Sequence, residues 1–417
     1  MYRVKNIFKM MGCGMTALTV LLLGCGGVNK ESESGLAGSG TAAAPWQVTS
    51  AADLNRVSEL MLIEAEASIY SDDYYKLMGD VDLGGNAFTP IGTGESPINY
   101  FNGQFDCDGK SISNLSITTT DRNYTGLFGY LASGGVVRAC SLVNVRIDSS
   151  GDNVGAVAGY MAGALINTSV TGSVKGNNDV GGLVGLAVGA IEDSYSEAEV
   201  TGASRVGGLS GSCGVDVSNF QRVCTATNSY SSGMVTGVND VGGLVGSLSG
   251  TVSSSYATGV ASGSGTNVGG LVGFLSGTIR SAYATGLVSS SRINAGGLVG
   301  AVSDASASIT NAYTIGMVFG DTNEGGFIGR VIAGTPTISG SYWDRIRTGQ
   351  TAATGTSTSL VGVTDVDSTS LRNGSAFPGW ESSPATWSFS RGCDPRLTSV
   401  IHPERQYASE STCPPLR

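Results

Sequence analysis

Hydrophobic residues recur at fixed places along the chain, in copies of the pattern VGGLVG that stands at residues 241–246. Aligned on their last glycine, the copies end at Gly129, Gly159, Gly185, Gly211, Gly246, Gly273, Gly300 and Gly329. Successive copies lie 26 to 35 residues apart. A unit of this size cannot bury a hydrophobic face alone, so the spacing predicts units stacked into a solenoid.

Each unit divides into three short apolar pieces, as in VGGLVG at residues 268–273, GTIRSAYATG at 277–286 and LVSS at 287–290. Three strands per turn predict a three-sided coil, with glycines at corners where a side chain would obstruct the backbone. Aliphatic residues then stack in columns, one coil or about 4.8 Å apart. Two such columns are Leu183, Leu209, Leu244, Leu271, Leu298 and Phe327, and Ile191, Val252, Ile279, Ile309 and Ile338.

The ends of the array carry patterns that predict caps. Ser50 is a candidate N-cap for a helix whose apolar residues between 54 and 61 share one face. Such a helix would cover the core and the unpaired strand edge at the open end of the coil. A separate surface helix is the alternative. After Ile338 the repeat ends, and the tryptophan-rich residues 377–397 predict an irregular C-terminal cap.

A third column is aromatic and follows the aliphatic one by four residues. We call it the tyrosine row: Tyr195, Tyr230, Tyr256, Tyr283, Tyr313 and Tyr342. If the row is exposed, Tyr256, Tyr283 and Tyr313 are candidate ligand contacts that stack on sugar rings or pack against a partner. The even spacing favours the other interpretation, an internal row with the same orientation as the aliphatic column.

Composition supports tightly turned β-coils, because the chain has 64 glycines and only 13% charged residues.

The N-terminal residues do not follow the repeat pattern. Three basic residues precede an apolar run over residues 10–23, which is short for a membrane span and typical of a signal peptide. The run ends in Leu-Leu-Gly-Cys25, which resembles the lipobox of bacterial lipoproteins. That resemblance implies a lipid on Cys25, an outer-membrane location and, through residues 26–44, a flexible tether.

Removal of the signal peptide takes away three of the 23 basic residues and none of the 33 acidic ones, which leaves a net charge of −13. Nucleic acid is therefore not an expected partner.

Six cysteines remain besides Cys13 and Cys25, and an exported protein permits disulfides. Cys213 and Cys224 lie in the one unusually long unit and are the best pair. Cys393 and Cys413 could join in the tail, which leaves Cys107 and Cys140 by elimination.

At the start of the array, the segments YKL, DVDL, PIG, FDCDG with ISNLSI, and TGLFG resemble the entry coils of GLUG-motif proteins, which are bacterial surface proteins and adhesins. Cys107 stands where that family usually has glycine. The resemblance implies a right-handed parallel β-helix, here a three-sided β-solenoid of about ten coils. We therefore expect a signal peptide (1–24), a tether (25–45), an N-terminal cap with entry coils (46–124), the repeat solenoid (125–340) and a C-terminal cap and tail (341–417).

The sequence does not favour enzymatic chemistry. His402, the only histidine, lies in the tail, so neither a HExxH zinc site nor a Ser-His-Asp triad is expected. A polysaccharide lyase or hydrolase on a β-helix is the enzymatic alternative, and it would need clustered carboxylates with a basic residue. The acidic residues look scattered and suit turn caps instead: Asp152, Asp179, Asp240, Asp304 and Asp321. No metal or cofactor is expected, although calcium could bind between coils.

These features predict a lipid-anchored β-solenoid that faces the cell surface or the periplasm and presents a long, rigid, mildly acidic side for recognition. Repeated serines and threonines, as in SSSYATG and RSAYATG, suit many weak contacts. Another cell, a matrix, a carbohydrate or a protein surface would be the ligand, and the membrane is a partner through the lipid. A structural spacer with no ligand of its own is the remaining alternative.

Overall fold

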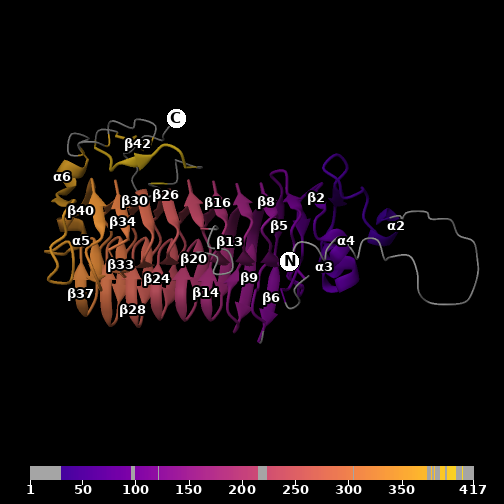
Figure 1. The fold of residues 1–417 in the computed structure, drawn as a ribbon, viewed down its shortest axis with the longest axis horizontal. Helices are drawn as coiled ribbons and strands as arrows, with labels where there is room; N and C mark the ends of the chain where they lie inside the picture. Colours follow the sequence, from indigo (N-terminus) through magenta and orange to yellow (C-terminus); the bar gives the residue numbers. More distant parts are fainter. Residues whose placement is uncertain are drawn as a thin grey trace, which may run out of the picture.

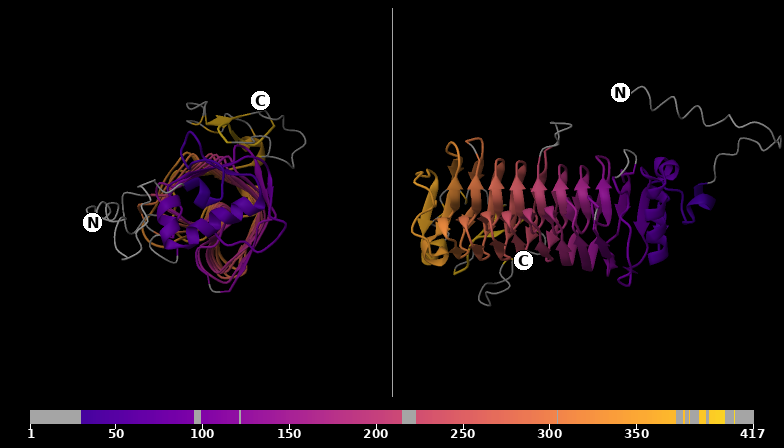
Figure 2. Two further views of the ribbon diagram at one scale, coloured as in Figure 1. Left: turned by 90° about the vertical axis from the view of Figure 1, so that its right-hand side faces the viewer. Right: turned by 90° about the horizontal axis from the view of Figure 1, so that it is seen from below.

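The chain forms a β-solenoid of about ten coils, seen from the side in Figure 1 and from its N-terminal end in the left view of Figure 2. This computed structural model describes residues 30–94, 99–120, 122–214, 223–303, 305–372, 377, 380, 386–389, 392–400 and 406. Strands of successive coils pair in parallel, so that Leu165 lies beside Ile191, and Val252 beside Ile279. The predicted aliphatic columns are buried inside the coil. The expected solenoid is confirmed.

Two small sheets carry the VGGLVG copies. From the second copy onward, the first half of each copy lies in a sheet of β10 (Val154–Gly155), β14 (Asn178–Gly181), β19 (Ser204–Gly207), β24 (Asn239–Gly242), β28 (Thr266–Gly269), β32 (Ile293–Gly296) and β37 (Thr322–Gly325). The second half lies in a sheet of β7 (Phe128–Leu131), β11 (Ala158–Met161), β15 (Val184–Ala187), β20 (Ser210–Cys213), β25 (Val245–Leu248), β29 (Val272–Leu275), β33 (Val299–Val302) and β38 (Ile328–Val331). We call them the first-half and second-half sheets.

The remaining faces of the coil belong to a third, larger sheet. Its strands before the central repeats are β1 (Trp46–Val48), β2 (Tyr74–Leu77), β3 (Val81–Asp82), β4 (Gln104–Asp106), β5 (Ser111–Ser113), β6 (Ser116–Thr119), β8 (Val136–Arg138), β9 (Ser141–Ser149), β12 (Ala164–Ile166) and β13 (Ser169–Lys175). The next are β16 (Ala190–Glu192), β17 (Tyr195–Ser196), β18 (Glu199–Thr201), β21 (Thr225–Thr227), β22 (Tyr230–Ser231), β23 (Val235–Gly237), β26 (Thr251–Ala257) and β27 (Ala261–Gly263). The last are β30 (Thr278–Ala284), β31 (Val288–Ser290), β34 (Ser308–Thr310), β35 (Tyr313–Thr314), β36 (Val318–Phe319), β39 (Thr337–Ser339), β40 (Ser341–Asp344) and β41 (Val363–Val366).

The motif glycines let copies in neighbouring coils approach closely. A Cβ atom on Gly243 would lie 2.1 Å from the carbonyl oxygen of Gly270, and one on Gly246 would lie 2.4 Å from the amide nitrogen of Val206. Neither position has room for a side chain, so glycine is required by backbone contact rather than by backbone dihedral angles.

Helices α3 (Ala51–Leu62) and α4 (Glu64–Tyr70) close the N-terminal end of the coil (Figure 2). The Ser50 hydroxyl accepts a hydrogen bond from the amide of Asp53 at 3.2 Å, as expected of an N-cap. Leu54, Val57, Leu60 and Met61 are buried against the coil. The expected capping helix is present.

The flexible tether expected at residues 25–45 is contradicted from Lys30 onward. Helix α2 (Lys30–Ser34) and the residues after it pack on the cap: Lys30 pairs with Asp73 at 3.2 Å, and Leu36 is buried. The amide of Tyr74 donates to the carbonyl of Gly40 at 3.0 Å. The packed part of the described chain therefore reaches at least to Lys30, because these backbone groups find partners in the first coil.

At the C-terminal end, the coil continues through β40 and β41, with α5 (Arg345–Thr348) and α6 (Ser368–Leu371) beside them. The tryptophan-rich segment with β42 (Trp387–Ser388) and β43 (Arg396–Leu397) does not sit on the end. It lies along the side of the coil, over β26 to β40 in Figure 1. Asp394, with a fully buried side chain, holds it in place through Arg347 at 2.7 Å and Arg372 at 3.3 Å.

Two of the expected disulfides are present, Cys213–Cys224 and Cys107–Cys140. The second joins two neighbouring coils, which explains a cysteine at the position where the resembling family has glycine. Cys393 is disulfide-bonded, but Cys413 lies outside the described residues, so that pairing stays a prediction. Cys25, Asp304 and His402 also lie outside them.

Candidate functional site

One residue before each motif copy adopts the left-handed backbone conformation, with φ between 52° and 63° in this column. We call this column the polar ladder: Tyr124, Asn153, Asp179, Arg205, Asp240, Asn267, Asn294 and Asn323. Asn and Asp tolerate this conformation better than other residues with a Cβ atom, which accounts for their frequency here. The sequence singled out some of these acids as caps of their own turns, whereas in the structure the ladder side chains bond between coils.

The C-terminal part of the ladder is a chain of amide hydrogen bonds. Each Asn donates its Nδ2 to the Oδ1 of the residue one coil earlier: Asn323 to Asn294 at 2.8 Å, and Asn294 to Asn267 at 2.7 Å. The chain ends with Asn267, which donates to Asp240 at 2.7 Å. These bonds tie adjacent coils together in the same direction as the strand pairing.

In the middle of the ladder the amides are replaced by charges. The Nε and Nη2 atoms of Arg205 each donate to Asp179, both at 2.7 Å. The Ser212 hydroxyl, from the next coil of the second-half sheet, donates to the same Oδ1 that accepts from Nε. Hydrogen bonding to Asp179 raises the pKa of the Arg205 guanidinium. Burial raises the pKa of the Asp240 carboxyl, which lies one coil beyond Arg205.

This charged section is where two of the acids singled out from the sequence meet a basic residue, as the lyase or hydrolase alternative requires. A general base, however, needs an oxygen free to approach the substrate. Both oxygens of Asp179 already accept hydrogen bonds from Arg205. The geometry is that of a structural ion pair.

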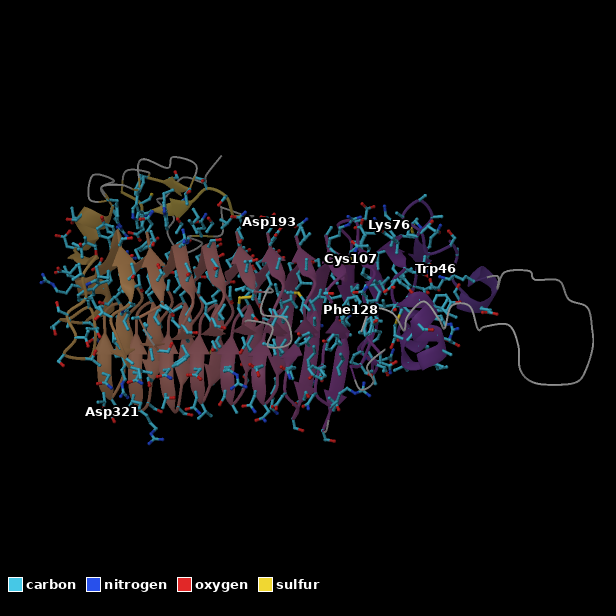
Figure 3. The ribbon with its side chains drawn as sticks, viewed as in Figure 1. Trp46, Lys76, Cys107, Phe128, Asp193 and Asp321 are labelled. Atoms are coloured by element: carbon cyan, nitrogen blue, oxygen red, sulfur yellow. A yellow bond between two sulfur atoms is a disulfide. The ribbon has the colours of Figure 1, made fainter. Side chains whose placement is uncertain are left out.

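The other acids are dispersed. Asp152 accepts hydrogen bonds from the side chains of Asn177 and Asn178 at 2.9 Å. Figure 3 shows Asp321 on the opposite edge of the coil from Asp193. Within the described ranges, no three His, Cys, Asp or Glu residues gather into a possible metal site.

The tyrosine row lies outside the coil, not inside it. A left-handed residue, such as Ser281 between Ile279 and Tyr283, interrupts each strand and reverses its alternation. The residue after each tyrosine then points inward. A Cβ atom added to the motif glycine Gly270 would lie only 3.0 Å from the Cβ of Ala284. From Tyr195 to Tyr313, successive rings stack with centroids 4.7 to 5.0 Å apart.

From Tyr230 to Tyr342 the row is nevertheless buried, because it packs with the C-terminal segment. Tyr256, Tyr283 and Tyr313 are all 0% exposed. Trp387 packs 6.3 Å from the ring of Tyr283 and 5.8 Å from that of Tyr313. The hydroxyl of Tyr313 donates to the carbonyl of Pro395 at 2.6 Å. The three candidate ligand contacts therefore have no exposed surface in this structure. The tyrosines are buried, as the second interpretation expected, but they lie outside the coil and not inside it.

A second group of tyrosines was not predicted from the sequence. Tyr130 and Tyr160 follow the last glycine of two successive motif copies, and both contact Tyr124 of the polar ladder. All three rings are partly exposed. The sequence carried a signal for this group, because a tyrosine follows the last motif glycine in two adjacent copies. Later copies have other residues at the same place: Leu186, Ser212, Ser247 and Phe274.

The larger sheet presents two parallel rows of hydroxyl side chains to solvent. They flank the buried residues of β21, β26, β30, β34 and β39, and all are at least partly exposed. The rows are Thr225, Thr251, Thr278, Ser308 and Thr337, and Thr227, Ser253, Thr310 and Ser339, with Arg280 at one place in the second. Stacking of the coils repeats these groups at the strand spacing.

Comparison with known proteins supports the architecture. Residues 176–201 match the model of the GLUG motif. The halomucin of Haloquadratum walsbyi is 35% identical over 150 residues, which are 34% of this chain and 2% of that protein. A candidate Gly-rich membrane protein of Evansella cellulosilytica is 32% identical over 142 residues, which are 32% of this chain and 15% of that protein. The chain thus spans a small part of these relatives.

Among solved structures, a candidate immunoglobulin A1 protease from Bacteroides ovatus aligns with 87% of this chain and 95% of its own, at 17% identity and a TM-score of 0.46. No helix within the described ranges is both long and apolar enough to cross a membrane. The motif match, the repeated copies and the relatives agree with the resemblance noted in the sequence. The chain therefore carries a GLUG motif at residues 176–201 and resembles GLUG-motif repeat proteins.

Proposed function

We propose that this chain is an adhesin-like binding protein of the bacterial surface, anchored by a lipid on Cys25 and directed at another cell, a matrix or a glycan. The observation that carries the proposal is the pair of hydroxyl rows on the larger sheet, which repeats the same polar groups over five coils. Many weak contacts of one kind add up to tight binding when the groups are held on a rigid support.

Two further observations support a binding role. The motif residues have structural roles, since their leucines fill the core and their glycines pack against backbone atoms. The carboxylate best placed for chemistry, Asp179, has both oxygens occupied. A relative named as a membrane protein agrees with a membrane or surface location.

The test is binding of the chain from residue 26 onward, which lacks the predicted lipid site, to a glycan array and to whole cells. Saturable binding to one class of surface is the expected result. A spacer without its own ligand predicts no binding to any of them. Release of products from a polysaccharide panel, abolished by Asp179→Asn without loss of folding, would instead favour the enzymatic alternative.

A further inference from the structure

The three partly exposed tyrosines near the N-terminal end of the repeats form an ordered aromatic cluster. Tyr130 and Tyr160 stack across adjacent coils of the second-half sheet, with centroids 4.4 Å apart and planes 23° apart. Tyr124 lies 5.9 Å from one and 6.2 Å from the other, at interplanar angles of 75° and 85°. A ring this close to both members of a stack and perpendicular to them lies across their edges. Tyr124 therefore lies beside the stack with its plane roughly perpendicular to both rings, and its own ring is partly exposed.

Tyr124 occupies a position that the scaffold does not require to be aromatic. Its φ of 59° is in the left-handed region, where a bulky residue is strained, and six of the other seven ladder positions hold Asn or Asp. A strained residue persists when its surroundings impose it, and such residues concentrate at functional sites. The chain thus places a partly exposed aromatic ring at a position where the other coils carry Asn, Asp or Arg.

Two polar residues adjoin the backbone of Tyr124, namely Asn123 before it and Asp152 in the next coil. The Oδ1 of Asn123 accepts from the amide of Asp152 at 2.9 Å, and the backbone amide of Tyr124 donates to the carbonyl of Asp152 at 3.0 Å. The Oδ1 of Asp152 accepts from Asn177 and Asn178. Its Oδ2 and the Nδ2 of Asn123 have no hydrogen bond in the part of the chain that the structure describes. A donor and an acceptor thus stand on two residues that adjoin Tyr124, one in sequence and one through its backbone.

An aromatic face with donors and acceptors around it matches the chemistry of a pyranose. The axial C–H groups of such a ring form an apolar face that packs on a π-system, while its hydroxyls lie at the rim. A charged sugar acid fits less well, because the backbone of Tyr124 pairs with the acidic residue Asp152 and the chain carries a net negative charge. We propose that Tyr124, supported by Tyr130 and Tyr160, binds a neutral pyranose unit of a glycan. This inference rests on the proposed binding function and names its ligand class and one of its sites.

The test uses residue types that the scaffold already accepts. Tyr124→Asn introduces the residue found at four other ladder positions, and Tyr160→Ser introduces the one found at the same place in two later copies. Tyr74→Ala removes an exposed tyrosine in β2 and serves as the matched control. The probes are neutral oligosaccharides of glucose, galactose, mannose and N-acetylglucosamine, titrated into the chain from residue 26 onward.

We expect Kd to rise at least about tenfold in Tyr124→Asn and Tyr160→Ser, and to stay unchanged in Tyr74→Ala. Far-UV circular dichroism and Tm should match the wild type in all three. Protection of Tyr124 from nitration by the bound oligosaccharide gives the same answer in the wild-type chain. Equal affinity of Tyr124→Asn and wild type, or no protection, overturns this site while the binding function stands. If the wild type binds only acidic glycans, this inference fails, and if it binds no surface at all, the proposed function fails with it.

Discussion

Replacement of Asp179 by Asn tests whether the charged section of the polar ladder is structural. The side chain of Asp179 is 11% exposed and that of Arg205 is 40% exposed, and two bonds of 2.7 Å join them. Breaking a fully buried pair costs about 3–5 kcal/mol, whereas an exposed pair contributes about 1 kcal/mol or less. The amide introduced by Asp179→Asn would keep one acceptor but would turn an NH₂ group toward Arg205. Because the pair is only half-buried, we expect a loss between these limits, about 2 kcal/mol in the free energy of unfolding at pH 7.

Asp240→Asn is the matched control, since it makes the same change in the same ladder. Burial raises the pKa of Asp240 above the usual 3.8, which means that the folded state disfavours its charge. In the wild type this effect lowers stability as the pH rises from 3.8 through the raised pKa. The Asn variant lacks it, so its Tm should exceed that of the wild type at pH 7, and the difference should vanish below pH 3.8.

Both variants are measured by chemical denaturation, with amide hydrogen exchange as a local readout because repeat arrays need not unfold as one unit. In Asp179→Asn, faster exchange should centre on the coils around residues 178–213. Unchanged stability of Asp179→Asn, combined with loss of ligand binding or of any hydrolytic activity, would refute the structural assignment.

Three further outcomes are expected. Tyr256→Ala should lower the free energy of unfolding by about 3–5 kcal/mol, because it leaves a cavity under the C-terminal segment. Ligand affinity should stay unchanged in a binding titration. Loss of binding with unchanged stability would show that the tyrosine row is part of the binding site. Replacing both Cys107 and Cys140 by Ala should lower stability by about 2–4 kcal/mol, measured by denaturation under oxidising conditions, whereas no change would show that the link between these coils is dispensable. Cys25→Ser should move the protein from the membrane to the soluble fraction and abolish labelling by radioactive fatty acid; retention in the membrane would contradict the lipid anchor.

The sequence predicted the coil because its pattern repeats with the coil. Leu244 and Leu271 are equivalent in the sequence and stack in space, and the extra length between Gly211 and Gly246 pointed correctly to the Cys213–Cys224 loop. The capping helix was predictable because both Ser50 and the apolar face are local signals.

The orientation of the tyrosine row could not be predicted from spacing alone. A single left-handed residue reverses the direction of the side chains that follow, and serine at position 281 gives no strong signal for that conformation. The cover over the row comes from residues far along the chain, such as Pro395 and Trp387, which no periodicity links to it. The partners of the ladder acids are also one coil away, so local turn rules missed them.

The most direct test of this account is hydroxyl-radical footprinting of tyrosine side chains, with and without the glycan that binds best. In the free protein, Tyr124, Tyr130 and Tyr160 should be oxidised readily, while the buried Tyr256 and Tyr283 should react slowly. Added glycan should protect the first three and leave the others unchanged. Rapid oxidation of Tyr256 and Tyr283 that the glycan suppresses, with no effect at Tyr124, would contradict both the covered tyrosine row and the proposed binding site.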